Sequence, residues 1–584
     1  MTVTQRPWWK DVAIYQIYPA SFQDSNGDGI GDLQGIIQRL DYIKSIGVDV
    51  VWICPMYESP QLDMGYDISD YQAIHGPYGT MADMDQLIAE VHRRGMRIIL
   101  DLVVNHTSDQ HSWFKESRSS KSNPKRDWYI WKPAKYDEQG NRKPPNNWRS
   151  NFGGSAWKWD EHTQEYFLHL FCPEQPDLNW PLLTAFGLQD NDETRRAIYE
   201  TAMIYWLEKG ADGFRVDTVN MYSKDPSFPD APITDHEAEW QEAGLVYCNG
   251  PRMNEYLSEM NSILTRYDAM TVGECPFTPD RNKVIDYVGA SKKRLSMVFQ
   301  FDVVDVGQGK IFKYQTAPFA YKLHDLKNAI ARTQGLLLGT DAWTTSFVEN
   351  HDQARAISRF GNDSPQWRER SGKMLSLLFA SLSGTLFIYQ GQEIGMINMP
   401  PDWPIEEYKD VDSINYYSMV AQRSGNNESE LSKAKESLQH LSRDHARTPM
   451  QWDSARNGGF TGDSVEPWMR MNPSTAELNV SRQTASKDSV LAFWKRMLAL
   501  RKQANDVLVN GHFELVDEAN ETVFSFLKHG KTRSALIVCN FSSNETTMPQ
   551  IASDRKKEVV MDNVSETTSE STLMPWQARM YMLH

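Results

Sequence analysis

The chain has 584 residues, enough for two or three domains rather than one small domain. Hydrophobic residues make up 40% of it, and the 19 Trp, 24 Tyr and 23 Phe supply enough apolar surface to exclude an intrinsically disordered chain. The formal net charge of −16 argues against a nucleic-acid partner, because an acidic surface repels phosphates. The sequence lacks any run of about 18 apolar residues, so no membrane-spanning segment and no membrane partner are expected.

The cysteines form no recognisable pattern. The five are scattered and include no C-x-x-C pair, so neither a disulfide framework nor a zinc site is expected. The N-terminal segment lacks the apolar core and the small-residue cleavage site of a secretory signal. Both observations favour a cytoplasmic location.

Short apolar runs alternate with segments of helical periodicity over most of the chain. For example, Leu33, Ile36, Leu40 and Ile43 recur at the spacing of an amphipathic helix. The predicted strands are 13–18, 48–53, 97–104, 213–219, 270–274, 297–301, 345–349 and 385–389. Eight βα units predict an α/β fold of the (β/α)8 TIM-barrel type. A doubly wound open sheet is the alternative, although no G-x-G-x-x-G motif supports it.

The alternation is interrupted once and stops before the C-terminus. Residues 107–179 are polar and rich in turn-forming residues, and this segment is too long for a plain loop, so it predicts a small inserted domain. From residue 511 onward, short strands separated by polar turns predict a C-terminal antiparallel β-sandwich. The predicted organisation is a barrel (1–106 and 180–510), an inserted domain (107–179) and the sandwich (511–584).

Ionisable residues lie at or near the C-terminal ends of four of the predicted strands. They are Asp101 and His106, Arg215 and Asp217, Glu274, and His351 with Asp352. Because functional side chains of such barrels gather at the C-terminal ends of the strands, we expect these residues to share one rim. Several carboxylates in one cleft suit glycoside hydrolysis. One carboxylate must be ionised to attack or stabilise the cation-like sugar centre, and another must be protonated to donate to the leaving oxygen.

The neighbours of two carboxylates suggest which role each takes. Arg215 lies two residues before Asp217 on the same face of a strand, where a charge-assisted hydrogen bond can keep Asp217 ionised and oriented. Glu274 has less polar neighbours, and a less polar setting favours a protonated carboxyl. We therefore expect Glu274 to be the general acid.

Five motifs around these residues carry a family resemblance. DLVVNH (101–106), GFRVDTV (213–219), TVGEC (271–275) and FVENHD (347–352) resemble the four short regions of the α-amylase superfamily, glycoside hydrolase family 13. QPDLN (175–179) resembles a fifth region of the oligo-1,6-glucosidase and α-glucosidase subfamily, and SRDHARTPMQW (442–452) is similar to fungal and yeast maltases and isomaltases. The order and spacing match over about the first 510 residues, and five ordered motifs are far more specific than one.

The resemblance implies a retaining, exo-acting α-glucosidase that needs no cofactor for catalysis. It assigns Asp217 as the nucleophile, Glu274 as the general acid/base and Asp352 as the stabiliser of the transition state. Asp63 and Arg447 are expected to bind the non-reducing end of the substrate and close the pocket, and Asp101 to support Arg215. The full set of implied substrate-binding residues is Asp63, Tyr66, His106, Phe171, Arg215, Thr218, His351 and Arg447.

Thr218 carries the expectation about the linkage that is cleaved. In the resembling subfamily, Val at this position accompanies α-1,6 isomaltases, whereas Thr or Ala accompanies α-1,4 maltases. The resemblance therefore implies a maltase that acts on maltose, sucrose and related disaccharides, with transglycosylation as a side activity; an isomaltase (oligo-1,6-glucosidase) is the alternative. A side chain next to Asp217 should point to the opposite face of the strand unless the strand end twists, so Thr218 could also simply pack.

Three other functions are compatible with parts of the pattern. A non-catalytic binding or transporter subunit is disfavoured, because all three carboxylates are present. A sucrose isomerase or transglucosylase would share the chemistry and differ in the acceptor. An endo-acting amylase would need an open groove, which the Arg447 region and the large insertion argue against.

An acidic loop follows the first predicted strand. Asp24, Asn26, Asp28, Ile30 and Asp32 fall at alternate positions like the start of a calcium-binding loop, but Gly35 occupies the place of the usual bidentate Glu. Family members often hold a structural Ca²⁺ at these positions, so Ca²⁺ is expected, with Mg²⁺ as an alternative ion. The other interpretation is an Asp- and Gly-rich turn that caps the first helix.

Overall fold

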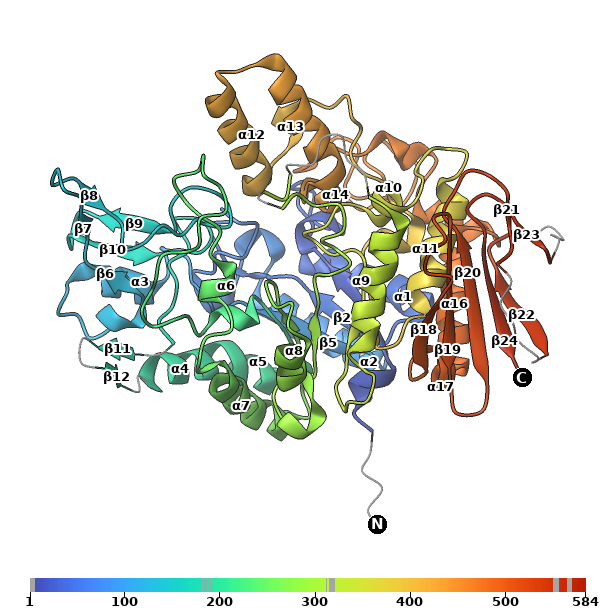
Figure 1. Ribbon diagram of the computed structural model, residues 1–584, viewed down its shortest axis with the longest axis horizontal. Helices are drawn as coiled ribbons and strands as arrows, with labels where there is room; N and C mark the ends of the chain where they lie inside the picture. Colours follow the sequence, from blue (N-terminus) through green and yellow to red (C-terminus); the bar gives the residue numbers. More distant parts are fainter. Residues whose placement is uncertain are drawn as a thin grey trace, which may run out of the picture.

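The centre of the molecule is a barrel of eight parallel strands (Figure 1). The structure is a computed structural model, and it describes residues 6–180, 182–184, 187–189, 192–310, 312–314, 321–549, 556–564 and 570–584. The strands are β1 (Ala13–Ile17), β2 (Val50–Ile53), β5 (Arg97–Leu102), β13 (Gly213–Val216), β14 (Met270–Glu274), β15 (Met297–Phe299), β16 (Thr345–Ser346) and β17 (Thr385–Tyr389). This confirms the predicted TIM barrel.

The strands follow one another around the barrel in the order β15-β14-β13-β5-β2-β1-β17-β16, with parallel pairing throughout. The two end strands are joined by a side chain, because the Thr345 hydroxyl donates to the Val298 carbonyl oxygen at 3.1 Å. β13 and β16 end three residues earlier than predicted, since the chain leaves the sheet at Val216 and Ser346 to enter the rim.

Helices cover the outside of the barrel. They are α1 (Leu33–Ile46), α2 (Met81–Arg93), α7 (Met253–Leu264), α8 (Arg281–Val288), α9 (Leu323–Gly335), α11 (Arg368–Ala380), α16 (Val490–Gln503), and α4 (Asp192–Ile198) with α5 (Tyr205–Glu208), which a π-helical segment connects. Local capping explains where several begin. Asp32 accepts from the Gly35 N–H at the start of α1, and Thr80 forms a capping box with Asp83 at the start of α2.

The interior of the barrel is filled with large side chains. The Trp52 ring stacks on Phe299 with centroids 5.7 Å apart, and Phe387 packs edge-on against Phe299 at 4.7 Å. These rings belong to one buried apolar cluster to which most of the barrel strands contribute.

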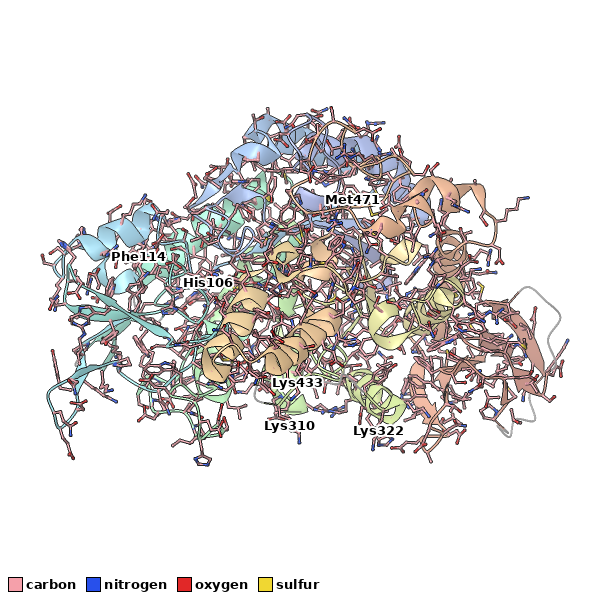
Figure 2. All side chains as sticks on the ribbon, turned by 90° about the horizontal axis from the view of Figure 1, so that it is seen from above. His106, Phe114, Lys310, Lys322, Lys433 and Met471 are labelled. Atoms are coloured by element: carbon pink, nitrogen blue, oxygen red, sulfur yellow. The ribbon has the colours of Figure 1, made fainter. Side chains whose placement is uncertain are left out.

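Two inserted elements stand beside and above the rim. The first contains α3 (Ser112–Ser119), a sheet of β6 (Trp131–Lys132), β9 (Trp157–Asp160) and β10 (Glu165–Leu168), and the strand pairs β7 (Lys135–Tyr136) with β8 (Arg142–Lys143) and β11 (Leu182–Thr184) with β12 (Gly187–Gln189). The second, which the sequence did not reveal as a unit, is a hairpin of α12 (Val411–Ser424) and α13 (Glu428–Leu441). Figure 2 marks the two with Phe114 on α3 and Lys433 on α13.

Shorter elements complete the barrel region. They are β3 (Tyr57–Glu58), β4 (Asp70–Ile74), α6 (Gly244–Tyr247), α10 (Ala356–Phe360), α14 (Asp444–Arg447), α15 (Val480–Ala485) and α17 (Asn505–Leu508).

The C-terminal region is an antiparallel β-structure at the end of the molecule opposite the first insertion (Figure 1). Its main sheet contains β18 (His512–Val516), β19 (Val523–His529), β20 (Ser534–Asn540), β24 (Ala578–Leu583) and β22 (Lys557–Asp562), in that order, and β21 (Thr546–Thr547) pairs with β23 (Thr572–Leu573). Leu573 packs into an apolar cluster with side chains of the main sheet. The exact boundaries of the three predicted domains stay a prediction.

Two properties of the described residues concern the environment of the protein. None of the helices in the described part of the chain combines the length and the apolar character needed to cross a bilayer. The five cysteines are all buried and none is in a disulfide.

Candidate active site

The Arg215 guanidinium is the centre of the polar cluster at the rim. It is 1% exposed and lies 2.7 Å from Asp101, 2.5 Å from Asp217 and 2.8 Å from Glu274. Asp101 is held in turn by Trp52, whose indole N–H donates to it at 2.8 Å. The ends of β5, β13 and β14 thus place three carboxylates around one cation, as the sequence pattern predicted for this rim.

Burial favours one shared proton on this cluster. It raises the pKa of Glu274 to about 7, and the negative charges of Asp217 and Asp352 add to the shift while Arg215 opposes it. Burial also raises the pKa of Asp217, again against Arg215. Asp217 accepts from Arg215 through Oδ1 and from the Thr218 hydroxyl through Oδ2 (3.3 Å), which favours its ionised form. Glu274 is therefore the better proton carrier of the pair.

His351 presents an unused donor to the cavity. Gln16 donates to its Nδ1 at 2.8 Å, so the ring proton resides on Nε2. Nε2 is buried and has no hydrogen-bond partner in the described part of the chain, although Asp352 Oδ2 lies 3.3 Å away. Burial lowers the pKa of His351 to about 3, so the ring is neutral. An unsatisfied buried N–H at the rim suits a ligand hydroxyl.

Aromatic rings define one wall of the same site. Tyr66 stacks on His351 with centroids 5.0 Å apart and planes 9° from parallel. Phe171 packs against His106 with centroids 5.1 Å apart. Tyr66 and Phe171 thus lie beside the two histidines to which the sequence assigned substrate contacts.

His106 is oriented by a buried network. Its Nε2 contacts the Tyr66 carbonyl oxygen at 3.1 Å, and the Asn105 amide contacts its Nδ1 at 3.3 Å. Asn105 is fixed by Asp177 at 3.1 Å and by Lys224 at 3.2 Å, and these two form an ion pair of 2.9 Å. Asp177 belongs to the QPDLN motif, so this motif ties the inserted domain to the rim.

Two arginines, Arg443 and Arg447, form ion pairs with Asp352. Arg447 lies 2.8 Å and Arg443 3.1 Å from Asp352 Oδ1. Burial alone would raise the pKa of Asp352, but the adjacent His351 and the charges of these arginines outweigh it and hold that pKa well below its usual range. Asp352 is therefore ionised at neutral pH.

The partner of Asp63 is Arg443, whereas the resemblance had grouped Asp63 with Arg447. Arg443 pairs with Asp63 at 3.1 Å, whereas no ion pair joins Arg447 to Asp63 within the described residues. Gln175 donates to the other oxygen of Asp63 at 3.0 Å, and Asp410 pairs with both arginines. Arg443 and Gln175 were overlooked although each belongs to a motif that had been singled out. Asp410 gave no sequence signal, because only folding brings it to the rim.

Thr218 faces the site because the strand ends before it. β13 stops at Val216, and Thr218 adopts a left-handed conformation with φ of 37°. Its backbone N–H donates to Glu274 at 3.2 Å, and its hydroxyl contacts Asp217. The chain thus leaves the extended strand conformation before Thr218, and this places its hydroxyl next to Asp217.

The acidic loop is internally hydrogen bonded. Asp24 accepts from the N–H groups of Asn26, Gly27 and Gly29 and from the Thr461 hydroxyl. Asn26 Oδ1 accepts from the Asp28 N–H and Asp28 from the Ile30 N–H, while Asp32 caps α1. No group of three His, Cys, Asp or Glu side chains in the described residues is arranged to hold a metal. These contacts explain the turn without an ion, and Ca²⁺ stays a prediction.

Comparison with known proteins places the chain among carbohydrate-active enzymes. Residues 16–511 match the family described as "Alpha amylase, catalytic domain". The chain is 49% identical to an alpha-glucosidase of Candida albicans over 585 residues, covering 100% of both chains. It is 47% identical to oligo-1,6-glucosidase IMA2 of Saccharomyces cerevisiae over 591 residues, covering 99% of this chain and 98% of the relative.

A solved structure agrees over the same length. The isomaltulose synthase of Erwinia rhapontici NX5, in complex with its natural substrate sucrose, superposes with a TM-score of 0.90 at 37% identity and covers 99% of this chain and 100% of the other. Relatives named alpha-glucosidase and oligo-1,6-glucosidase match at nearly equal identity, so identity by itself does not separate the two.

Proposed function

Because this chain belongs to the α-amylase family of glycoside hydrolases, we propose that it is a retaining, exo-acting α-glucosidase of the maltase type. Its substrates would be maltose, sucrose and related short α-glucosides. The observation that carries the proposal is the Arg215 guanidinium, whose two terminal nitrogens lie 2.5 Å from an Asp217 oxygen and 2.8 Å from a Glu274 oxygen and so keep the two carboxylates near each other. Retaining enzymes need such closely spaced carboxylates, since no water has to fit between nucleophile and sugar.

The chemistry follows from the state of each group. Asp217 attacks the anomeric carbon of the glucosyl unit while Glu274 gives its proton to the glycosidic oxygen, so that one C–O bond forms as the other breaks. Glu274, now ionised, then removes a proton from water, which attacks the anomeric carbon and releases glucose with a free Asp217. A sugar hydroxyl in place of water would give transglycosylation. Asp352 and the His351 N–H would bind the sugar hydroxyls.

The exo action rests on the closed end of the cavity. The contacts that join Asp63 to Arg443 and Arg443 to Asp352 support this part of the proposal, because they would form a barrier beyond the glucosyl unit. An open groove for the middle of a starch chain would not contain this barrier. Rapid liquefaction of starch by the purified enzyme would contradict this part of the proposal.

The preference for α-1,4 linkages rests on Thr218. Its hydroxyl lies at the catalytic carboxylates, where it can hydrogen bond to the leaving sugar or to a water beside it, whereas Val would offer only a methyl group. Such a hydrogen bond contributes about 0.5–1.5 kcal/mol, up to about tenfold in discrimination. The test is the ratio of kcat/KM for maltose and isomaltose, which should favour maltose in the wild type and shift toward isomaltose in Thr218→Val. A wild type that prefers isomaltose would establish the oligo-1,6-glucosidase alternative.

We also propose that the acidic loop can take a structural Ca²⁺, because its donors are all oxygens, as this ion prefers. Asp24, Asn26, Asp28, Asp32 and the Ile30 carbonyl would hold it, and some loop hydrogen bonds would have to be exchanged for ion contacts. Metal analysis of the purified protein, with Tm measured before and after chelation, tests this. A metal-free protein whose Tm does not respond to added Ca²⁺ would leave the capping turn as the only function of the loop.

For the compartment we propose the cytoplasm, supported by five buried cysteines without a disulfide. Fractionation of cells that produce the protein tests this, and recovery from the culture medium would contradict it.

A further inference from the structure

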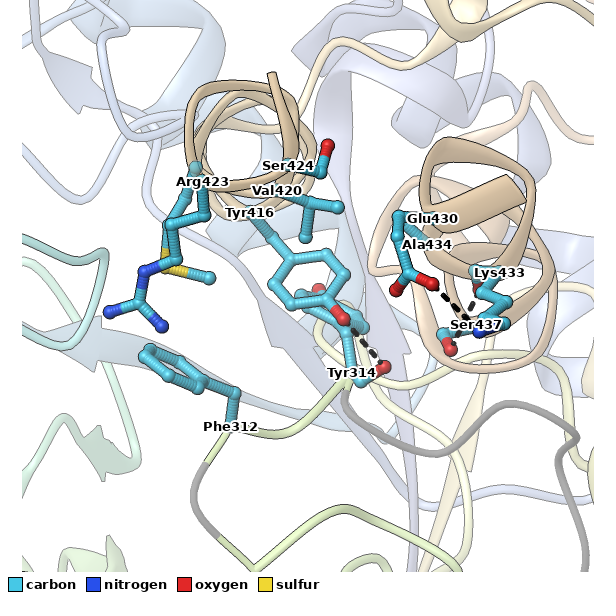
Figure 3. A pocket seen from close by; sticks show the side chains of 11 residues that line it. Phe312, Tyr314, Tyr416, Val420, Arg423, Ser424, Glu430, Lys433, Ala434 and Ser437 are labelled. Carbon is cyan, nitrogen blue, oxygen red and sulfur yellow. Dashed lines mark hydrogen bonds and ion pairs between the residues drawn. The ribbon is translucent and has the colours of Figure 1, made fainter. Parts of the chain in front are cut away.

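A cavity of about 380 Å³ lies between α12, α13 and residues 312–314, and we call it the hairpin pocket (Figure 3). Its lining shares no residue with the candidate active site. Three aromatic side chains, Phe312, Tyr314 and Tyr416, contribute to its walls. Ligand pockets typically measure ~300–1,000 Å³, so this one suits a small molecule.

The aromatic wall is held in place by hydrogen bonds. The Tyr416 hydroxyl donates to the Tyr314 carbonyl oxygen at 3.1 Å, and the Tyr314 hydroxyl donates to Asp412 at 2.8 Å. On the α13 side the buried residues Ala434 and Ser437 have small side chains, which leaves the space open. A rigid aromatic face opposite an open space is preorganised for a flat, partly apolar ligand.

The charged rim favours a neutral ligand with hydroxyl groups. Lys433 is paired with Glu430 at 2.8 Å, whereas the Arg423 guanidinium lies 5.7 Å from the Phe312 ring centroid and makes no hydrogen bond or ion pair within the described residues. Among the described residues that line the pocket, Arg423 is thus the one cation without an ion pair, which is too little for a multiply charged phosphate. Arg423 as a donor and Glu430 as an acceptor can instead bind neighbouring hydroxyls, while an aromatic ring packs on the apolar face of a pyranose.

From these features we propose that the hairpin pocket is a second saccharide-binding site that takes a short, neutral glucosaccharide and is separate from the catalytic cavity. The choice of a glucosaccharide rests on the proposed function, because the substrates of such an enzyme would be present around it. Occupation of the pocket requires no chemical step.

Calorimetric titration of the full-length Asp217→Asn variant with maltotriose tests the proposal. Two binding events are expected, one in the catalytic cavity and one in the hairpin pocket. Ala434→Leu added to this variant fills the pocket and should leave one event. Ser432→Leu is the matched control, since it adds the same side chain to an exposed position of the same helix and should leave two. In case Ala434→Leu impairs folding, Arg423→Ala should weaken the second event about tenfold.

A single event in Asp217→Asn, or two unchanged events in both Ala434→Leu and Arg423→Ala, would overturn the second site. Failure of the proposed function is seen separately, as an absence of maltose hydrolysis by the wild type. Arg443→Ala in the same background identifies the catalytic event, because it should weaken that event alone.

Discussion

Two regions of this molecule compensate buried cations in different ways. At the rim, Arg215, Arg443 and Arg447 each contact two or more carboxylates. Where the C-terminal sheet meets the barrel, Arg501 donates to the carbonyl oxygens of residues 380, 382 and 384, and Lys528 to Ser383 and the Gly511 carbonyl. Neither of these two has a carboxylate partner within the described residues.

The pKa shifts of the two groups run in opposite directions. Burial lowers the pKa of Arg501 to about 9 and that of Lys528 well below its usual value. Burial acts the same way on Arg215, but Glu274 and Asp101 outweigh it and raise the pKa of Arg215. Carboxylates at the rim therefore stabilise the charged form of a buried cation, whereas at the interface burial disfavours the charged form and the cations donate hydrogen bonds, mostly to backbone carbonyls.

Of the changes at the rim, Asp217→Asn should have the largest effect on activity. Loss of the nucleophile is expected to lower kcat on maltose by at least ~10⁴-fold. Tm should stay within about 2 °C of the wild type, because an amide of the same shape still fits the site. Steady-state kinetics and calorimetry measure both, with the exposed Asp268→Asn as control. Near-normal turnover by Asp217→Asn would refute its role.

Arg443→Ala is expected to have the next largest effect, since it opens the closed end of the cavity. Loss of its contacts to Asp63 and Asp352 should lower kcat/KM for maltose about 100-fold, mainly through KM. Kinetics of this variant beside Arg482→Ala, which alters an exposed arginine, test the expectation. An unchanged KM would mean that Arg443 does not bind substrate.

The proton on Glu274 predicts a pH dependence. Glu274 has a pKa of about 7 and loses its proton above that pH, so kcat/KM should fall about tenfold per pH unit above it. A carboxyl with a raised folded-state pKa stabilises the fold less as pH rises through that pKa. Glu274→Gln keeps the neutral form, so its Tm should exceed that of the wild type at pH 8, with a smaller difference at pH 5. Equal Tm differences at both pH values would contradict the raised pKa.

Lys528→Met should have the smallest effect and sharpen the contrast. The folded state disfavours the charged lysine, and the Ser383 hydroxyl still donates to the Gly511 carbonyl oxygen at 2.6 Å without it. We expect unchanged kcat and a Tm that does not fall. The matched change Arg215→Met at the rim should abolish activity and lower Tm, since it leaves three carboxylates unpaired. A large loss of Tm in Lys528→Met would show that the interface also depends on charge.

Local patterns in the sequence were sufficient for the barrel and for most of the rim. Buried parallel strands appear as continuous apolar runs, and the residues at their C-terminal ends, such as Asp101 and Glu274, meet at one end of the barrel for geometric reasons. The side on which the Thr218 side chain lies could not be predicted from the sequence, because it depends on where β13 ends and on the left-handed backbone of Thr218.

By itself, therefore, the sequence determined the fold class and the carboxylates at the strand ends, since both depend on periodicity and on neighbours along the chain. Only the tertiary structure decided that Arg443 rather than Arg447 reaches Asp63, that Asp410 joins them, and that α12 and α13 enclose a second pocket. These contacts join residues that are distant in the chain, 380 positions apart for Arg443 and Asp63. Their distances are fixed by packing around the barrel, which no local pattern of residues encodes.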